Sequence, residues 1–206
     1  MARSKPSERA RSRILSDEEL RAVWKAASQP DDVFGAYVRF LLLTAARRDE
    51  AAEISRSEIK DGVWTIPGAR YKTGIDMVLP LSASALRVLE TLPRIGPDRY
   101  VFTRSGERAF GGLSSAKVKF DKACGVAGWV IHDLRRTARS LMSRAGVSSD
   151  IAEICLGHKL AGVRGIYDRH RYLEEKQRAF ESLASLIERI VNPPADNVVA
   201  LEQARK

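Results

Sequence analysis

The segment from Ile131 to His170, IHDLRRTARSLMSRAGVSSDIAEICLGHKLAGVRGIYDRH, decides how this chain folds and what chemistry it offers. It contains all three histidines of the sequence, His132, His158 and His170, and one tyrosine, Tyr167. Histidine can accept, donate or bind a proton near neutral pH, and tyrosine carries a hydroxyl that can act as a nucleophile. Because this segment concentrates both residue types, it is the place to look for a reactive site.

An amphipathic helix is predicted to begin near His132. At about 100° per residue, His132, Arg135 and Arg139 fall on one side of this helix, so the first two can project together. Taken alone, the HxxR spacing fits an ordinary solvated helix face better than a site. The opposite side is apolar and predicts burial: Leu134, Ala138, Leu141, Met142 and Ala145.

The LGH triplet predicts a turn at the end of another helix. Gly157 can end that helix and place His158 in the turn, and Tyr167 follows nine residues later, in a new short helix. A tyrosine hydroxyl has a free pKa near 10 and becomes a nucleophile when basic groups help to remove its proton. Without such a context, Tyr167 fits a surface or core residue better.

Two further basic residues lie in patterned positions upstream. Arg47, in TAARRDE, precedes Glu50 by three residues, which is usually a helix-surface pair but can also hold a guanidinium in a fixed pose for binding phosphate. Lys72 lies in a KTG turn, where a lysine is normally just exposed. Neither signal is specific alone.

The periodicities along the chain predict a mainly α protein with a small antiparallel β-sheet, an α+β fold. About three strands are expected between Ser57 and Ser82, with tight turns at Asp61-Gly62 and at the KTG triplet. Helices are expected from the N-cap Ser16, over Val33 to Ala45 and onward to about Ile54, from Ser82 to Leu92, over Leu113 to Cys124, and over Leu173 to Val191.

The composition limits the function classes. The 206 residues include 35 Lys and Arg against 26 Asp and Glu, a formal charge of +9, which favours a polyanionic partner but also fits a basic soluble protein. The two cysteines, Cys124 and Cys155, form no cluster with metal-ligand spacing, and no phosphate loop or dinucleotide fingerprint is present. No apolar run approaches membrane-spanning length, so we expect a cytoplasmic protein that does not interact with membranes.

The order of these motifs resembles the tyrosine recombinase (phage integrase) family. The matching residues are Thr44 to Glu50, Lys72, His132 to Arg135, Leu156 to His158, and Tyr167. Ala45 occupies a position that is often glycine in the family, a difference expected to be harmless in a helix. The resemblance implies a catalytic domain over residues 14–192, between a basic tail or linker (1–13) and a C-terminal tail (193–206).

The resemblance also implies a role for each matched residue. Tyr167 would attack a DNA phosphodiester and form a 3′-phosphotyrosyl link. Arg47, Arg135 and His158 would bind the non-bridging phosphate oxygens, Lys72 would protonate the leaving 5′-oxygen, and His132 would assist as an acid–base or oxygen-binding group. No metal, cofactor or ATP is implied.

The implied partner is double-stranded DNA. The resemblance implies a homotetramer on DNA and a monomer for the isolated domain. Arg136, Arg139, Lys159 and Arg164 are candidates for contacts with the phosphate backbone, with surface ion pairs as the alternative. Val198, Val199 and Leu201 form a hypothetical docking patch in the tail. The sequence leaves open whether the chain is a catalytic fragment or a short relative, and two other functions: type IB topoisomerase-like DNA relaxation, or a non-catalytic DNA-binding module.

Overall fold

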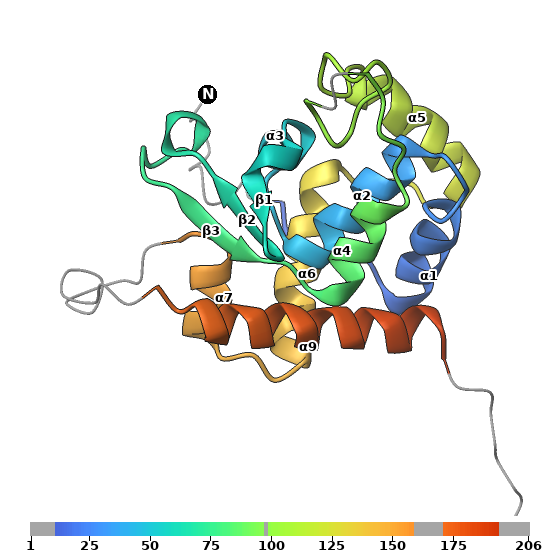
Figure 1. Cartoon of the computed structure of the whole chain (residues 1–206). Helices are drawn as coiled ribbons and strands as arrows, with labels where there is room; N and C mark the ends of the chain where they lie inside the picture. Colours follow the sequence, from blue (N-terminus) through green and yellow to red (C-terminus); the bar gives the residue numbers. More distant parts are fainter. Residues whose placement is uncertain (1–10, 97–98, 159–170, 194–206) are drawn as a thin grey trace, which may run out of the picture.

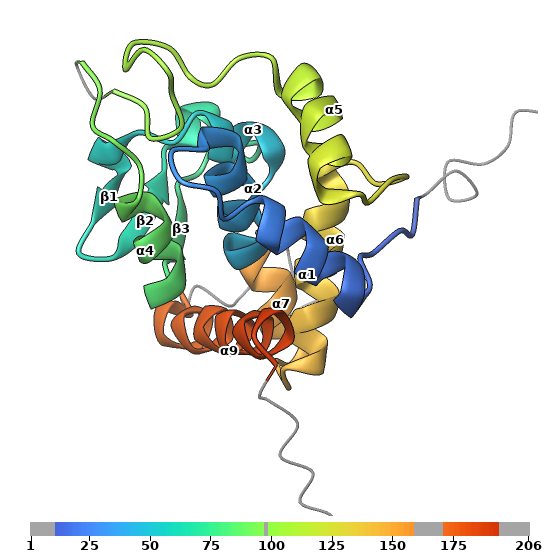
Figure 2. The ribbon, with the colours of Figure 1, turned by 90° about the vertical axis from the view of Figure 1, so that its right-hand side faces the viewer.

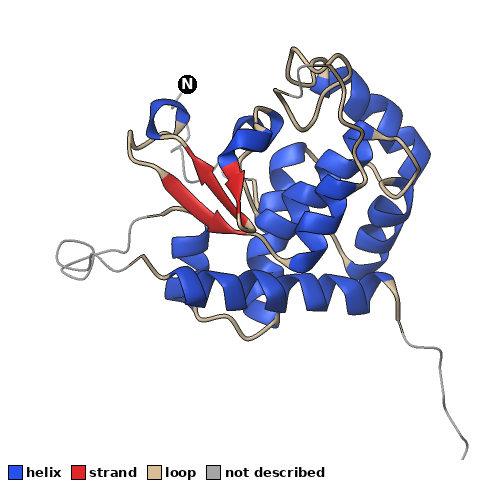
Figure 3. Cartoon of the chain, viewed as in Figure 1, coloured by secondary structure: helices blue, strands red, loops and turns tan. Residues whose placement is uncertain are grey.

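The computed structural model describes residues 11–96, 99–158 and 171–193, which form a helical body with a small sheet on one side (Figures 1 and 3). The sequence-based prediction of a mainly α protein with a small antiparallel sheet is confirmed. Within these residues, no helix combines the length and apolar character needed to cross a bilayer. The helices are α1 (Asp17–Ala26), α2 (Val33–Thr44), α3 (Arg48–Ala52), α4 (Ala83–Glu90), α5 (Leu113–Cys124), α6 (Ile131–Arg144), α7 (Ser149–Cys155) and α9 (Leu173–Val191), and the strands are β1 (Ile59–Lys60), β2 (Val63–Ile66) and β3 (Met77–Pro80).

Helix α2 forms the centre of the core. Every residue of α2 except Val33 and Arg39 is buried, as expected for a helix that is apolar on all sides. It packs against α4 and α6, and the ring of Phe40 lies 5.5 Å from the rings of both Trp64, on β2, and Phe102. The same helix therefore joins the sheet to the helical body.

Helix α9 crosses the base of the domain (Figures 1 and 2). Its apolar stripe, which includes Phe180, Leu183 and Ile187, is buried against the rest of the protein. The helix contacts α1, α6, α7 and β3, so it connects elements from both ends of the chain. These contacts hold α7 beside the sheet.

The three strands are antiparallel in the order β1-β2-β3. Asp61 and Gly62, which join β1 to β2, both have positive φ values of 50° and 75°, as a type I′ turn requires. Trp64 pairs with Leu79 across β2 and β3 and is fully buried. The connection between β2 and β3 covers residues 67–76 and carries Lys72, as the sequence predicts.

The predicted continuous helix from Val33 to Ile54 is wrong. Helix α2 ends at Thr44, Ala45 adopts the left-handed conformation with φ 51°, and α3 begins at Arg48. Ala45 is therefore outside any helix, and the left-handed region costs a residue with a Cβ about 1–2 kcal/mol. The Ala45 carbonyl accepts a hydrogen bond from the Arg135 guanidinium, a tertiary contact that local helix propensity does not include.

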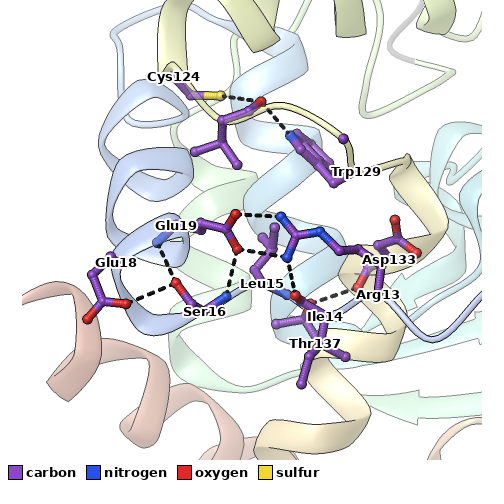
Figure 4. Close-up of polar contacts among 12 residues, drawn as sticks. Arg13, Ile14, Leu15, Ser16, Glu18, Glu19, Cys124, Trp129, Asp133 and Thr137 are labelled. Carbon is purple, nitrogen blue, oxygen red and sulfur yellow. Dashed lines mark hydrogen bonds and ion pairs between the residues drawn. The ribbon is translucent and has the colours of Figure 1, made fainter.

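The N-terminal segment is attached to α1 and α6 (Figure 4). Ser16 caps α1 as predicted: its hydroxyl accepts from the Glu19 amide, and the Glu19 carboxylate accepts from the Ser16 amide. Arg13 donates to both carboxylate oxygens of Glu19, and the Leu15 amide donates to Thr137 Oγ1 at 2.9 Å. The last residues of the predicted basic tail are thus in contact with the domain, while residues 1–10 lie outside the described residues.

Candidate active site

Arg47 is held at the start of α3 by the carboxylate of Glu50. Arg47 is the N-cap residue of α3, so its amide makes no hydrogen bond within the helix. This amide donates instead to Glu50 Oε2 at 3.1 Å. The Arg47 guanidinium donates to Glu50 Oε1 at 2.7 Å, so one carboxylate fixes both the backbone and the side chain. Burial opposes the charge of Arg47, but hydrogen bonds with Tyr71 and Glu50 outweigh burial and raise its pKa.

The β2–β3 connection brings Tyr71 against Arg47. Arg47 Nη1 donates to the Tyr71 hydroxyl at 3.2 Å, and the guanidinium carbon lies 5.3 Å from the centre of the Tyr71 ring. Tyr71 is buried, whereas the next residue, Lys72, is exposed. The connection therefore anchors one side chain in the site and leaves the predicted general acid at the surface beside it.

Arg135 comes from α6 and lies behind the site. Its guanidinium donates to the carbonyl of Ala45 and, at 2.6 Å, to the carbonyl of Leu156. The residue is only 6% exposed, which excludes the solvated-face interpretation of the HxxR spacing for this arginine. Burial, and then repulsion from Arg47, lower the pKa of Arg135 to about 10. A bound anion would relieve both effects.

The LGH triplet ends α7 as predicted. Gly157 has φ 69°, its amide donates to the Ile154 carbonyl, and the His158 amide donates to the Glu153 carbonyl. These two bonds form the Schellman motif, which fixes the direction in which the chain leaves a helix. The turn points His158 toward α6, where its Nε2 lies 3.4 Å from Arg135 Nη2.

The orientation of the His158 ring is set by Glu153. His158 Nδ1 lies 2.5 Å from Glu153 Oε2, and Arg139 donates to the other carboxylate oxygen at 2.8 Å. Burial raises the pKa of Glu153, but the hydrogen bonds from His158 and Arg139 outweigh burial. The pKa of Glu153 is therefore lowered, and its ionised form is favoured. An ionised carboxylate can only accept, so we assign a proton to Nδ1, which leaves Nε2 facing Arg135.

His132 lies at the exposed start of α6, next to the buried carboxylate of Asp133. Asp133 accepts from the Val130 amide at 2.9 Å and from Arg11 and Arg136 at 2.9 and 2.7 Å, which anchors this end of α6. Although His132 is exposed, partial desolvation of its ring lowers its pKa, and the charges of Arg136 and Arg135 act in the same direction. The neutral imidazole is therefore favoured.

Arg47 and Tyr71, which contact each other, line two different grooves. Arg47 and His132 line one groove of about 600 Å³. Tyr71, Thr73 and His158 line the other, of about 650 Å³. Because Arg47 lines one groove and His158 the other, the arrangement suits an extended anion whose charge falls between these two side chains.

The structure brings together four of the six predicted site residues: Arg47, His132, Arg135 and His158. It places Lys72 on the adjacent exposed connection. Tyr167 and the short helix expected around it lie outside the described residues, as do Lys159, Arg164 and the docking patch of Val198, Val199 and Leu201. The sequence-based reasoning missed Tyr71 and Glu153. Arg136 and Arg139, predicted as candidates for DNA contact, have the ion-pair partners Asp133 and Glu153.

The comparisons with known proteins identify the family and the fold. A sequence profile for the phage integrase family matches residues 13–174. The chain belongs to the phage integrase family. Prophage integrase IntA of Escherichia coli K12 is 32% identical over 151 residues, which are 71% of this chain and 37% of that protein. Prophage integrase IntZ of the same strain is 30% identical over 188 residues, 84% of this chain and 44% of its own length. The chain thus spans less than half of either relative.

A solved structure shares the fold. The lambda integrase catalytic core superposes with a TM-score of 0.59 at 21% identity, over 72% of this chain and 96% of that one. Similarity at this level of identity shows the fold alone, and it confirms the tyrosine recombinase catalytic-domain architecture that the sequence predicts. The phage integrase motifs within the described residues therefore lie on the expected scaffold.

Proposed function

We propose that this chain is a catalytic domain that cleaves and rejoins DNA through a covalent bond between Tyr167 and a 3′-phosphate. The observation that supports it most is the convergence of Arg47, at the start of α3, Arg135, on α6, and His158, which follows α7. Planar guanidinium groups and an imidazole suit the non-bridging oxygens of a phosphodiester, whose charge must be stabilised in the transition state.

The proposed reaction balances without an external energy source. The Tyr167 oxygen forms a bond to phosphorus and passes its proton to neutral His132 or to water, while the bond from phosphorus to the 5′-oxygen breaks. Lys72, on the exposed β2–β3 connection, donates the proton that the leaving 5′-oxygen needs. His132, favoured in its neutral form, assists as a proton acceptor or by binding an oxygen. Attack by a 5′-hydroxyl from another strand reverses these steps and restores Tyr167.

The proposed biological role is site-specific recombination, with integration or excision of a prophage or genomic island. The curated relatives are named prophage integrases. Lambda integrase has been captured as a tetramer bound to a Holliday junction. We propose double-stranded DNA and other copies of the chain as partners, with a homotetramer as the active assembly and a monomer in the absence of DNA.

The proposal is tested by trapping the covalent intermediate on nicked DNA. Duplexes that tile the DNA flanking the gene are nicked so that cleavage releases a short fragment and rejoining cannot occur. The wild-type chain is expected to give a protein–DNA band on a denaturing gel with EDTA present and ATP absent. Tyr167→Phe should give none, while Tyr172→Phe, which changes a tyrosine five residues away, should retain the band.

Other outcomes distinguish the alternative functions. A band in wild type together with relaxation of supercoiled plasmid, but without recombinant products, would favour a topoisomerase-like enzyme. Tight binding of a duplex without any band would favour a non-catalytic DNA-binding module. A band that persists in Tyr167→Phe would remove Tyr167 as the nucleophile.

A further inference from the structure

Tyr71 occupies a position between two parts of the candidate phosphate site. On one side, its hydroxyl accepts a hydrogen bond from Arg47 Nη1 at 3.2 Å, and its ring lies beneath the guanidinium with 5.3 Å from ring centre to Cζ. The residue is 7% exposed, so little solvent competes for either contact. Two residues, Glu50 and Tyr71, therefore hold the Arg47 guanidinium in its orientation.

On its other side, the Tyr71 hydroxyl lies against the backbone of Gly157. A Cβ atom added at Gly157 would lie 1.9 Å from the Tyr71 oxygen, which is far inside contact distance. The side chain of Tyr71 thus fills the space that a larger residue would occupy in the turn before His158. Only a residue without Cβ leaves room for this hydroxyl.

We propose that Tyr71 is a positioning residue that sets the separation between Arg47 and the His158 turn. The Tyr71 hydroxyl binds the Arg47 guanidinium on one side and packs against Gly157 on the other. One oxygen atom therefore sets the positions of both phosphate-binding groups, Arg47 and His158. Because Lys72 is the next residue, the same anchor also fixes the base of the exposed segment that carries it. This inference rests on the proposed DNA cleavage. Tyr71 acts through its neighbours and does not itself attack DNA.

The alternative is that Tyr71 is only a core residue, whose ring fills space. Tyr71→Phe separates the two, because it keeps the ring and removes the hydroxyl. Hydrogen bonds to charged groups have effects that correspond to roughly a 10-fold to 100-fold change in rate when they act in the transition state. We expect a decrease of that size in single-turnover formation of the covalent adduct at saturating DNA, with unchanged DNA affinity. The matched control is Tyr100→Phe, a partly buried tyrosine whose ring also lies beside an arginine, Arg99.

Cleavage of a second substrate tests whether the Tyr71 hydroxyl acts through Arg47. In a methylphosphonate diester, a methyl group replaces one charged non-bridging oxygen, so a guanidinium contributes less to cleavage. The deficit of Tyr71→Phe should shrink on this substrate relative to the phosphodiester. A purely structural loss would reduce cleavage of both substrates by the same factor, and that result would overturn the proposal.

The contact with Gly157 is tested independently of activity by urea unfolding of four proteins: wild type, Tyr71→Phe, Gly157→Ala and the double variant. The positive φ of Gly157 penalises alanine in both backgrounds, whereas the collision with the hydroxyl exists only when Tyr71 is present. Gly157→Ala should therefore lower the unfolding midpoint less in the Tyr71→Phe background. Equal decreases in both backgrounds would show that the two groups do not meet, and the inference would be wrong.

Failure of this inference and failure of the proposed function give different results. If wild type forms the adduct and Tyr71→Phe does so at the same rate, the positioning role is wrong and the function stands. If wild type forms no adduct on DNA that it binds, the proposed function is wrong, and the unfolding cycle still decides whether Tyr71 braces the turn. An adduct lost in Tyr71→Phe but kept in Tyr167→Phe would overturn both.

Discussion

Two adjacent carboxylates on α3, those of Glu50 and Asp49, test directly whether burial increases the contribution of an ion pair to stability. Glu50 is 8% exposed and accepts from both the amide and the guanidinium of Arg47. The Asp49 side chain is 69% exposed and pairs with Arg48 at 2.8 Å. We predict that Glu50→Ala lowers both stability and DNA cleavage, whereas Asp49→Ala lowers neither to a comparable extent.

The size of the effect follows from the two bonds that Glu50 makes. Loss of the bond from the Arg47 amide to the Glu50 carboxylate, comparable to loss of a helix cap, costs about 0.5–2 kcal/mol. Loss of the hydrogen bond from the charged Arg47 guanidinium in a poorly solvated place costs about 1.5–3 kcal/mol. Their sum is about 2–5 kcal/mol, or a decrease in Tm of about 4–20 °C for a chain of this size. The exposed Asp49 pair contributes about 0–1 kcal/mol. Cleavage should fall at least about 10-fold in Glu50→Ala, because Arg47 loses its fixed pose.

The assay compares urea unfolding and single-turnover adduct formation for wild type, Glu50→Ala and Asp49→Ala. Glu50→Gln serves as an intermediate, since an amide oxygen can still accept from the Arg47 backbone amide. Equal stability losses in the Glu50 and Asp49 variants would refute the reasoning from burial. Full cleavage activity in Glu50→Ala would show that the carboxylate does not position Arg47.

Two further predictions concern proton transfer. Lys72→Ala should reduce cleavage of ordinary DNA strongly, but reduce it little when a sulfur atom replaces the leaving 5′-oxygen, since a thiol is far more acidic than an alcohol and needs no proton donor; equal losses on both substrates would exclude Lys72 as the general acid. The pKa of His132 is lowered in the folded protein by partial desolvation and then by Arg136 and Arg135, so the unfolded chain binds the proton more tightly. Stability and His132-dependent cleavage should therefore be complete above pH of about 6.5 and decrease as the pH falls below it; a pH profile of adduct formation in which His132→Gln keeps the acid limb of wild type would contradict this role.

Local sequence patterns predicted much of the site because they act over one or two turns. The spacing of Arg47 and Glu50 predicts a pair, and the structure shows that pair at a helix start. Gly157 predicts a helix end, which is confirmed by its positive φ and by the Schellman bonds. The helix break at Ala45 was not predictable in this way, since Ala-Ala-Arg-Arg favours helix and the contact that opposes it comes from Arg135, far along the chain.

Residues that act through distant contacts were missed. Tyr71 differs from an ordinary buried aromatic residue of a loop only because Arg47 and Gly157 lie on either side of it. Its position before Lys72 was the one signal available. Glu153 lies five residues before His158, which on a continuous helix would place the two on different faces, and it is the reversal at Gly157 that brings them together. Lys72 and Tyr167 keep their assigned roles as predictions.

Tyr167 is proposed to become covalently bound to DNA, and peptide mapping of the trapped adduct identifies the residue that carries the DNA. Wild-type protein trapped on nicked DNA is digested with nuclease and protease, and the peptide that carries the remaining nucleotides is identified by mass spectrometry. We expect a nucleotide attached to the side chain of Tyr167 through a 3′-phosphate. Attachment to Tyr71, Tyr172 or any other residue, or linkage through a 5′-phosphate, would contradict it.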